Sequence, residues 1–374
     1  MLPALPQAFG NLKDVFRSAN DSLRGESNPL GLLKVKNSLV IMVDGLGWFN
    51  LTEHIGHVPF LKQFLHKSSK GYSGFPSTTA ASIVSFATGS SPSNSGFIGY
   101  RIFDRSKSES VNLLTGLDTA EIANYLLVSR ISDSQPKTVV VSKPEYEDSG
   151  FSSVTFKDVL FRSATGIDER FEIALDELNS GSGKLIYLYI PELDQAAHRF
   201  GYKSNNWLNL LELLDSSVRK LVSSASSDRG IVLTADHGII DVPESAHVYL
   251  DECDALAEVL DVAGDPRVNF IYFTPNTDVT AKQAEINDWL ADRAQAFTVQ
   301  QLVEAKLYEE SVLRLTEILP DLVLLPSGKN VCYHRHFAKA KSLQMIGQHG
   351  GISETEITIP ILRMAAYSSS LLVP

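Results

Sequence analysis

Three carboxylates and three imidazoles stand in four short segments of the sequence, and proteins use such groups to bind metal ions. The six residues are Asp44, Asp194, His198, Asp236, His237 and His349. Imidazole and carboxylate are ligands of zinc, and carboxylate also suits manganese. In isolation each has a plainer interpretation: an aspartate after a strand usually caps a helix or turn, and Asp194 and His198 have the spacing of a surface pair on a helix. Their joint occurrence predicts a metal site.

A candidate nucleophile lies in the segment Pro76-Ser77-Thr78-Thr79, which small residues follow as far as Thr88-Gly89. This pattern predicts a helix whose N-terminus carries hydroxyl groups. A helix N-terminus offers free N–H groups and positive potential to a phosphoryl oxygen. A hydroxyl group is a weak nucleophile until a base or a metal ion activates it. The alternative is that these hydroxyl groups only cap the helix.

The elements that must position these residues are predicted from continuous apolar runs, which are typical of strands buried on both faces. The runs cover residues 38–43, 138–141, 185–190, 230–234 and 357–362. Residues 207–222 lie between two of them and have leucines at helical spacing. The alternation predicts an α/β fold with a mostly parallel central sheet flanked by helices. Because ligands bind at the carboxyl ends of such strands, we expect the six residues at one sheet edge.

The expected domain organisation follows from changes in the pattern of predicted strands and helices along the chain. We expect an N-terminal arm with a short helix over residues 1–36, and a core formed by residues 37–249 and 346–374. Residues 250–345 are expected to form an inserted smaller α+β cap or lid. It joins the segments of His237 and His349, so we expect it to stand over the site. Its candidates for substrate contacts are Tyr272, Phe273, Tyr308, Tyr333 and His334.

Composition excludes several classes of protein. The net charge of −11 argues against a protein that binds duplex nucleic acid, since that needs a positive surface. No run approaches the roughly 20 apolar residues that span a bilayer, and the first residues have no signal-peptide pattern. The two cysteines, Cys253 and Cys332, have no framework spacing, so we expect reduced thiols in a cytoplasmic protein, with a disulfide between them as the alternative. Nothing predicts an oligomeric state.

The chain resembles the type I phosphodiesterase/nucleotide pyrophosphatase branch of the alkaline phosphatase superfamily. In that branch a Pro-Thr-Lys-Thr segment carries the nucleophile as its last residue, some nine residues before a Thr-Gly pair. Thr79 has that place here, with Thr88-Gly89 following. The resemblance implies an alkaline phosphatase-like core and two divalent metal ions, zinc or manganese. It implies that one ion is bound by Asp194, His198 and His349, and the other by Asp44, Asp236, His237 and Thr79.

Two positions depart from the pattern of this branch. An asparagine usually stands three residues after the nucleophile and helps to hold a phosphoryl oxygen, and here the residue is Ser82. A histidine often precedes the glycine of the next loop, and here the pair is Ser95-Gly96. Neither change removes a metal ligand. Substrate choice is affected, because Ser82 is the candidate contact to a phosphoryl oxygen.

The sequence therefore predicts a two-metal hydrolase that cleaves phosphodiester or pyrophosphate bonds of small, nucleotide-like substrates through a threonyl-phosphate intermediate. Phosphomonoesterase, phosphonate hydrolase or phosphomutase chemistry on the same scaffold is the nearest alternative. A sulfatase is disfavoured, because the segment Ser90-Ser91-Pro92-Ser93-Asn94 lacks the arginine that sulfatases need. The second alternative is a metal-binding protein without catalytic activity. The expected partner is a small phosphorylated substrate, without duplex nucleic acid or membrane.

Overall fold

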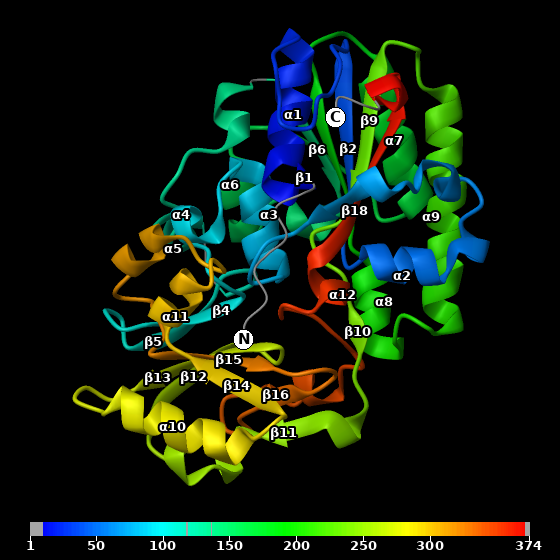
Figure 1. The fold of residues 1–374 in the computed structure, drawn as a ribbon. Helices are drawn as coiled ribbons and strands as arrows, with labels where there is room; N and C mark the ends of the chain where they lie inside the picture. Colours follow the sequence, from blue (N-terminus) through cyan, green and yellow to red (C-terminus); the bar gives the residue numbers. More distant parts are fainter. Residues whose placement is uncertain (1–9, 117–118, 136, 371–374) are drawn as a thin grey trace.

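The computed structural model describes residues 10–116, 119–135 and 137–370, and its largest element is an eight-stranded sheet (Figure 1). In spatial order the strands are β1 (Gly10–Asn11), β3 (Lys70–Tyr72), β18 (Thr358–Ala365), β9 (Arg229–Thr234), β2 (Asn37–Val43), β8 (Leu185–Ile190), β6 (Thr138–Ser142) and β7 (Leu160–Ser163). All are parallel except β18. The predicted mostly parallel sheet is confirmed, and the continuous apolar run of β2 is buried along its whole length.

The antiparallel strand β18 brings a distant segment to the functional edge of the sheet. Its first residue, Thr358, pairs with Tyr72 at the end of β3, and Ile361 pairs with Thr234 at the end of β9. The start of β18 therefore lies beside the carboxyl ends of the parallel strands. The segment before β18, which contains His349, reaches the same edge for that reason.

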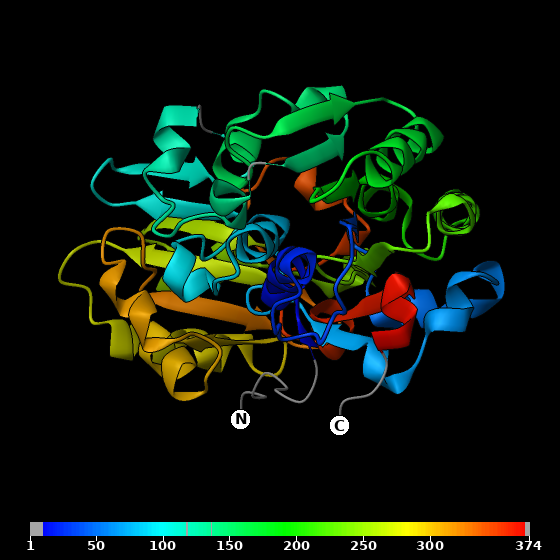
Figure 2. The ribbon, with the colours of Figure 1, turned by 90° about the horizontal axis from the view of Figure 1, so that it is seen from above.

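Helices cover both faces of the sheet, as Figure 2 shows from above. Helices α1 (Leu12–Arg24) and α3 (Thr79–Thr88) pack together on one side, and α7 (Ile167–Asn179) and α9 (Asn205–Ser224) pack together on the other. The shorter helices are α2 (Trp48–Glu53), α4 (Pro92–Ser95), α5 (Thr119–Ala123), α6 (Gly150–Thr155), α8 (Glu192–Phe200) and α12 (Glu354–Ile357). No helix of the described residues is long and apolar enough to cross a membrane.

The described part of the expected N-terminal arm, residues 10–36, contributes to the main hydrophobic core. Strand β1 extends the sheet beside β3, and α1 buries Leu12, Val15, Phe16 and Ala19 completely. These residues follow the i, i+3, i+4, i+7 spacing of one apolar helix face, which explains why α1 packs against the core and does not project into solvent. Residues 1–9 of the expected arm lie outside the described residues.

The segment expected to be a cap contains a separate antiparallel sheet, seen in the lower part of Figure 1. Its strands, in spatial order, are β12 (Val259–Asp265), β13 (Val268–Phe273), β15 (Leu322–Pro326) and β14 (Ala294–Phe297), with helices α10 (Val279–Leu290) and α11 (Val299–Glu304). The hairpin of β4 (Arg101–Asp104) and β5 (Glu109–Asn112) packs on β12. One hydrophobic cluster contains Phe75 and Ile83 as well as Tyr272 and Val323. The small sheet and the region around α3 therefore share one core.

Two short strand pairs connect the small sheet to the main one. β10 (Ile240–Asp241) pairs with β17 (Gly347–Gln348), and β11 (His247–Tyr249) pairs with β16 (Val331–Tyr333). The chain thus leaves the main sheet through β10 and returns beside it through β17. This pairing brings the residues before β10 and after β17 together, although more than a hundred residues separate them in sequence.

Candidate metal centre

The six predicted metal ligands lie together at the carboxyl edge of the main sheet. Asp44 directly follows β2, Asp236 and His237 follow β9, Asp194 and His198 lie on α8 after β8, and His349 follows β17. They form two adjacent groups. We call Asp194, His198 and His349 the outer group, and Asp44, Asp236, His237 and Thr79 the inner group.

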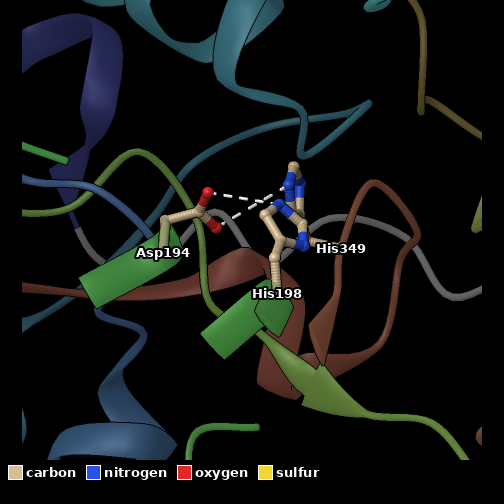
Figure 3. Close-up of side chains that lie close together, drawn as sticks. All are labelled: Asp194, His198 and His349. Atoms are coloured by element: carbon tan, nitrogen blue, oxygen red, sulfur yellow. Dashed lines mark ion pairs between the residues drawn. The ribbon is translucent and has the colours of Figure 1, made fainter. Parts of the chain in front are cut away.

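The outer group is arranged around the carboxylate of Asp194 (Figure 3). Its Oδ2 lies 3.2 Å from Nε2 of His198, and its Oδ1 lies 3.9 Å from Nε2 of His349. Asp194 and His198 are four residues apart on α8, so both face the same way. One ligand atom of each of the three residues lies within 4.8 Å of the others, a spacing that can surround a metal ion.

The inner group is arranged around Nε2 of His237. This atom lies 3.3 Å from Oδ2 of Asp236, 3.5 Å from Oδ1 of Asp44 and 3.1 Å from Oγ1 of Thr79. Asp194 is also close, because ligand atoms of Asp44, Asp194 and His237 lie within 4.8 Å of one another. The rings of His237 and His349 stack with centroids 3.6 Å apart. The two groups are therefore neighbours, and Asp194 lies between them.

The carboxylate oxygens of this site fit divalent cations. Oδ1 of Asp44, Oδ1 of Asp194 and Oδ2 of Asp236 are buried and have no hydrogen-bond partner among the described residues. Burying unpaired charges is costly unless an opposite charge compensates them. The other carboxylate oxygens of Asp44 and Asp236 accept hydrogen bonds. Tyr189 donates its hydroxyl to Oδ2 of Asp44, and the N–H groups of Gly45 and His237 donate to Oδ1 of Asp236 at 3.1 and 3.0 Å.

The three histidines are all oriented through their Nδ1 atoms. Nδ1 of His198 lies 2.7 Å from the carbonyl oxygen of Gly347. Nδ1 of His237 lies 3.2 Å from the carbonyl oxygen of Gly238, and Nδ1 of His349 lies 3.1 Å from that of Ser77. A carbonyl oxygen only accepts, so Nδ1 carries the proton in each ring. In the neutral form of each ring the Nε2 lone pair is then free to bind metal, which is the usual arrangement around histidine ligands.

The electrostatic environment differs among the side chains of the site. Burial, together with the neighbouring carboxylates, raises the pKa of Asp44 well above its ordinary value and raises the pKa of Asp236 to about 6. Burial also lowers the pKa of His237 to about 4 and that of His349 to about 3.

The Asp194–His198 pair behaves in the opposite way. Burial opposes charge on both side chains, but the two groups attract each other. The pKa of Asp194 is lowered and that of His198 is raised to about 9. Asp44, Asp236, His237 and His349 thus disfavour their charged forms, whereas the Asp194–His198 pair favours them.

Thr79 is the first residue of α3, and its Oγ1 faces His237 at 3.1 Å. Thr78 occupies the N-cap position but makes no capping hydrogen bond with its side chain. Ser77 instead donates its hydroxyl to the carbonyl oxygen of Gly351 at 2.8 Å. The hydroxyl groups of this segment therefore do not serve as helix caps. Ser82, one turn further along α3, is buried and its Oγ has no partner among the described residues.

Glycines allow the loops of the site to approach closely. A Cβ atom on Gly45 would lie 3.0 Å from Cβ of Asp194, and one on Gly238 would lie 2.0 Å from the carbonyl oxygen of Thr355. Gly45 also has a φ of 72°, in the left-handed region that favours glycine. A larger residue would displace Asp194 at the first position and the backbone of α12 at the second.

Several residues near the site gave no clear signal in the sequence. Tyr189 looks like part of a buried strand, and only the pairing of Tyr189 with Met42 places it on the same face of the sheet as Asp44. Asp265 lies at the tip of the β12–β13 hairpin. Conversely, the aromatic candidates Tyr272 and Tyr308 are buried in a hydrophobic cluster. Such long-range placements depend on strand register and packing.

Comparisons with known proteins identify the family and the fold of the chain. A family model described as type I phosphodiesterase/nucleotide pyrophosphatase matches residues 38–352. The fold is similar to murine ectonucleotide pyrophosphatase/phosphodiesterase 5, with 15% identity, 87% of each chain covered and a TM-score of 0.66. It is also similar to phosphonoacetate hydrolase from Sinorhizobium meliloti, with 17% identity, 87% of this chain and 89% of that chain covered, and a TM-score of 0.66. No match was found among curated protein sequences.

Proposed function

The chain belongs to the type I phosphodiesterase/nucleotide pyrophosphatase family and is a hydrolase of the alkaline phosphatase superfamily, and from that premise we propose its reaction. The proposed enzyme binds two divalent ions, zinc or manganese, and cleaves phosphodiester or pyrophosphate bonds of small, nucleotide-like substrates through a threonyl-phosphate intermediate on Thr79.

The observation that carries this proposal is that Thr79 stands at the N-terminus of α3 and also beside the candidate metal ligands. Its Oγ1 is 3.1 Å from His237, and Asp194 of the outer group lies within reach of the inner group. The first N–H groups of α3 have no partner within the helix, and Thr78 does not cap them with its side chain. They are therefore available to the oxygens of a phosphoryl group.

In the proposed mechanism, Asp44, Asp236, His237 and Thr79 hold one ion, and Asp194, His198 and His349 hold the other. When bound, the two ions would lower the pKa of the attacking hydroxyl group and offset the charge of the leaving oxygen. Oγ1 of Thr79 forms a bond to phosphorus while the bond to the leaving oxygen breaks. Water then attacks the same phosphorus and releases Oγ1 of Thr79.

The surrounding residues of the chain keep these groups in place. Tyr189 holds one oxygen of Asp44, and the N–H groups of Gly45 and His237 hold one oxygen of Asp236. The backbone carbonyl groups that accept from Nδ1 fix each imidazole ring. In this proposal Ser82 stands where it could contact a phosphoryl oxygen, since it shares a helix face with Thr79.

A phosphonate hydrolase or phosphomonoesterase on the same scaffold is the second candidate, because the fold is also similar to a phosphonoacetate hydrolase. These reactions would use the same two groups of ligands as the proposed phosphodiesterase. They differ from it in the part of the substrate that is attached to the phosphoryl group. A metal-binding protein without activity is disfavoured, since the six candidate ligands lie close together and Oγ1 of Thr79 lies beside His237.

We also propose a cytoplasmic location and a small phosphorylated substrate as the partner, without duplex nucleic acid or membrane. The reduced state of the cysteines supports the location: Cys253 and Cys332 are both free and buried. The net charge of −11 supports the exclusion of duplex nucleic acid.

The test combines metal analysis with two substrates. Purified protein should contain close to two transition-metal ions, and removing them should abolish hydrolysis. The metal-loaded enzyme should hydrolyse bis-nitrophenyl phosphate with a higher kcat/KM than nitrophenyl phosphate. A preference for the monoester would replace the diesterase by the phosphomonoesterase. Hydrolysis of phosphonoacetate alone would favour the phosphonate hydrolase.

A further inference from the structure

The tip of the β12–β13 hairpin is anchored to the main sheet beside the candidate metal centre. Arg267, in the turn that follows Asp265, is almost completely buried, and it donates to both carboxylate oxygens of Glu356 at 3.0 and 2.8 Å. Glu356 lies on α12 and is also fully buried. A bidentate arginine–carboxylate pair fixes the orientation of both side chains. The tip is therefore held in a defined position.

Glu356 also connects this anchor to the loops that carry metal ligands. Its carboxylate accepts from the N–H group of Gly351 at 2.9 Å, and its carbonyl oxygen accepts from the N–H group of Gly238 at 2.7 Å. Gly238 follows His237, and Gly351 lies two residues after His349. The hairpin tip and the two histidine loops thus share one set of contacts.

Asp265 is the residue that this tip presents to the site. A Cβ atom on Gly350 would lie 3.3 Å from Cβ of Asp265 and also 3.3 Å from Cγ2 of Thr78, so Asp265 stands against the loop of His349 and close to the start of α3. Its Oδ2 is buried and has no hydrogen-bond partner among the described residues. Asp261, on the same strand, also has a buried oxygen without a hydrogen-bond partner, but its other oxygen accepts from Ser110 and its carboxylate lies 3.7 Å from the charge of Arg101.

The charges around Asp265 belong mainly to the outer group. Burial raises the pKa of Asp265 to about 7, while His198 and Arg101 act to lower it and Asp194 to raise it. Arg101 is engaged elsewhere, with the carbonyl oxygens of Phe337 and Val262. Because Thr79 belongs to the inner group, an in-line attack on phosphorus would direct the leaving oxygen toward the outer group. Asp265 therefore adds a carboxylate on the side of the leaving oxygen.

We propose that Asp265 is a specificity-determining residue that favours a leaving group with a cationic or hydrogen-bond-donating substituent over one that carries a further phosphate. This inference rests on the proposed function. With two divalent ions bound, the three carboxylates of the centre leave one positive charge, and a phosphodiester anion balances it. Asp265 then adds a carboxylate whose ionised form a protonated amine on the leaving group would stabilise and a second phosphate would oppose.

The experiment measures binding to the zinc-loaded Thr79→Ala protein by calorimetry, with three probes: aminoethyl methyl phosphate, ethyl methyl phosphate and methyl diphosphate. We expect the aminoethyl ester to bind about tenfold more tightly than the ethyl ester. Adding Asp265→Asn should bring this ratio close to one and should tighten the binding of methyl diphosphate. Asp265→Ala should have the same effect.

The matched control is Asp251→Asn, which removes another carboxylate of the same segment, one that pairs with the exposed Arg335. It should leave all three affinities unchanged. If Asp265→Asn also leaves the ratios unchanged while the probes bind, Asp265 does not select the leaving group and the proposed function stands. If no probe binds to the zinc-loaded protein, the proposed function is overturned and this inference with it.

Discussion

The two halves of the candidate metal centre differ in how the fold holds them. The side chains of Asp236 and His237 in the inner group are completely buried, and the two residues stand just after the end of a central strand. In the outer group the side chain of His198 is 20% exposed, and the group is formed by a helix and a returning loop. The inner group is thus built by the main sheet, whereas the outer group faces the region of the hairpin tip.

This difference suggests a division of labour within one site. Strand ends in a buried parallel sheet hold side chains rigidly, which suits the activation of a nucleophile. A rim formed by a helix, a loop and an inserted segment can differ between relatives without disturbing the sheet, which suits substrate choice. The following predictions test the division, beginning with the largest expected effect.

Replacing the nucleophile should have the largest effect. Thr79→Ala should lower kcat by a factor of about 1,000 or more, because no other hydroxyl group contacts His237 among the described residues. Metal content, measured by mass spectrometry, should stay close to that of the unchanged protein, since six protein ligands remain. Thr78→Ala is the matched control and should retain activity. An inactive Thr78→Ala protein beside an active Thr79→Ala protein would place the nucleophile one residue earlier.

Removing one histidine from each group should separate their roles. His237→Ala and His198→Ala should each lower kcat/KM by about 100-fold or more and should each lose one of two bound ions. Asp194→Ala should reduce the occupancy of both sites, because Asp194 lies close to ligands of both groups. Metal analysis after gel filtration checks these outcomes. Loss of both ions from His198→Ala protein would show that the two groups do not bind metal independently.

Tyr189→Phe should have a smaller effect, confined to the inner group. It removes only the hydroxyl group that donates to Asp44, and loss of such an outer contact typically lowers metal affinity by about 10- to 100-fold. Competition with a coloured chelator would show weaker binding of one ion and unchanged binding of the other. Tyr187→Phe, on the same strand, is the control. Equal weakening of both ions would contradict a separate inner group.

The smallest expected effect concerns the ion pair of Arg267 and Glu356, which anchors the hairpin tip. Burial acts to raise the pKa of Glu356, but the charge of Arg267 outweighs it and the pKa is lowered. The pair then contributes stability above the ordinary glutamate pKa of about 4.3, and this contribution is lost as the pH falls through the lower folded value. Urea midpoints measured between about pH 5 and pH 3 should decrease with falling pH.

The double variant Arg267→Met/Glu356→Gln is the control for this pH dependence. Replacing both members of a buried pair is often nearly neutral for stability, whereas removing one is strongly destabilising. The double variant should therefore have a shallower dependence of the urea midpoint over the same range. An unchanged slope would assign the acid sensitivity to other carboxylates.

Local sequence patterns determined the strands β2, β6, β8, β9 and β18 of the main sheet and the polar residues that follow two of them. A continuous apolar run followed by Asp44, and another followed by Asp236 and His237, indicate buried parallel strands with polar ends. The helix over residues 207–222 was also predicted, and it extends only slightly further, as Asn205–Ser224. These features depend on residues close together in the chain, so the sequence contains their signal directly.

Only the tertiary structure decided the direction of β18, the contact of Tyr189 with Asp44 and the position of Asp265. A strand of residues 357–362 was predicted, but its antiparallel direction follows from pairing with β3 and β9. Arg267 and Glu356 are 89 residues apart and look like ordinary charged residues until packing buries them together. Such contacts depend on register and on the joining of two sheets, which local hydrophobic periodicity does not encode.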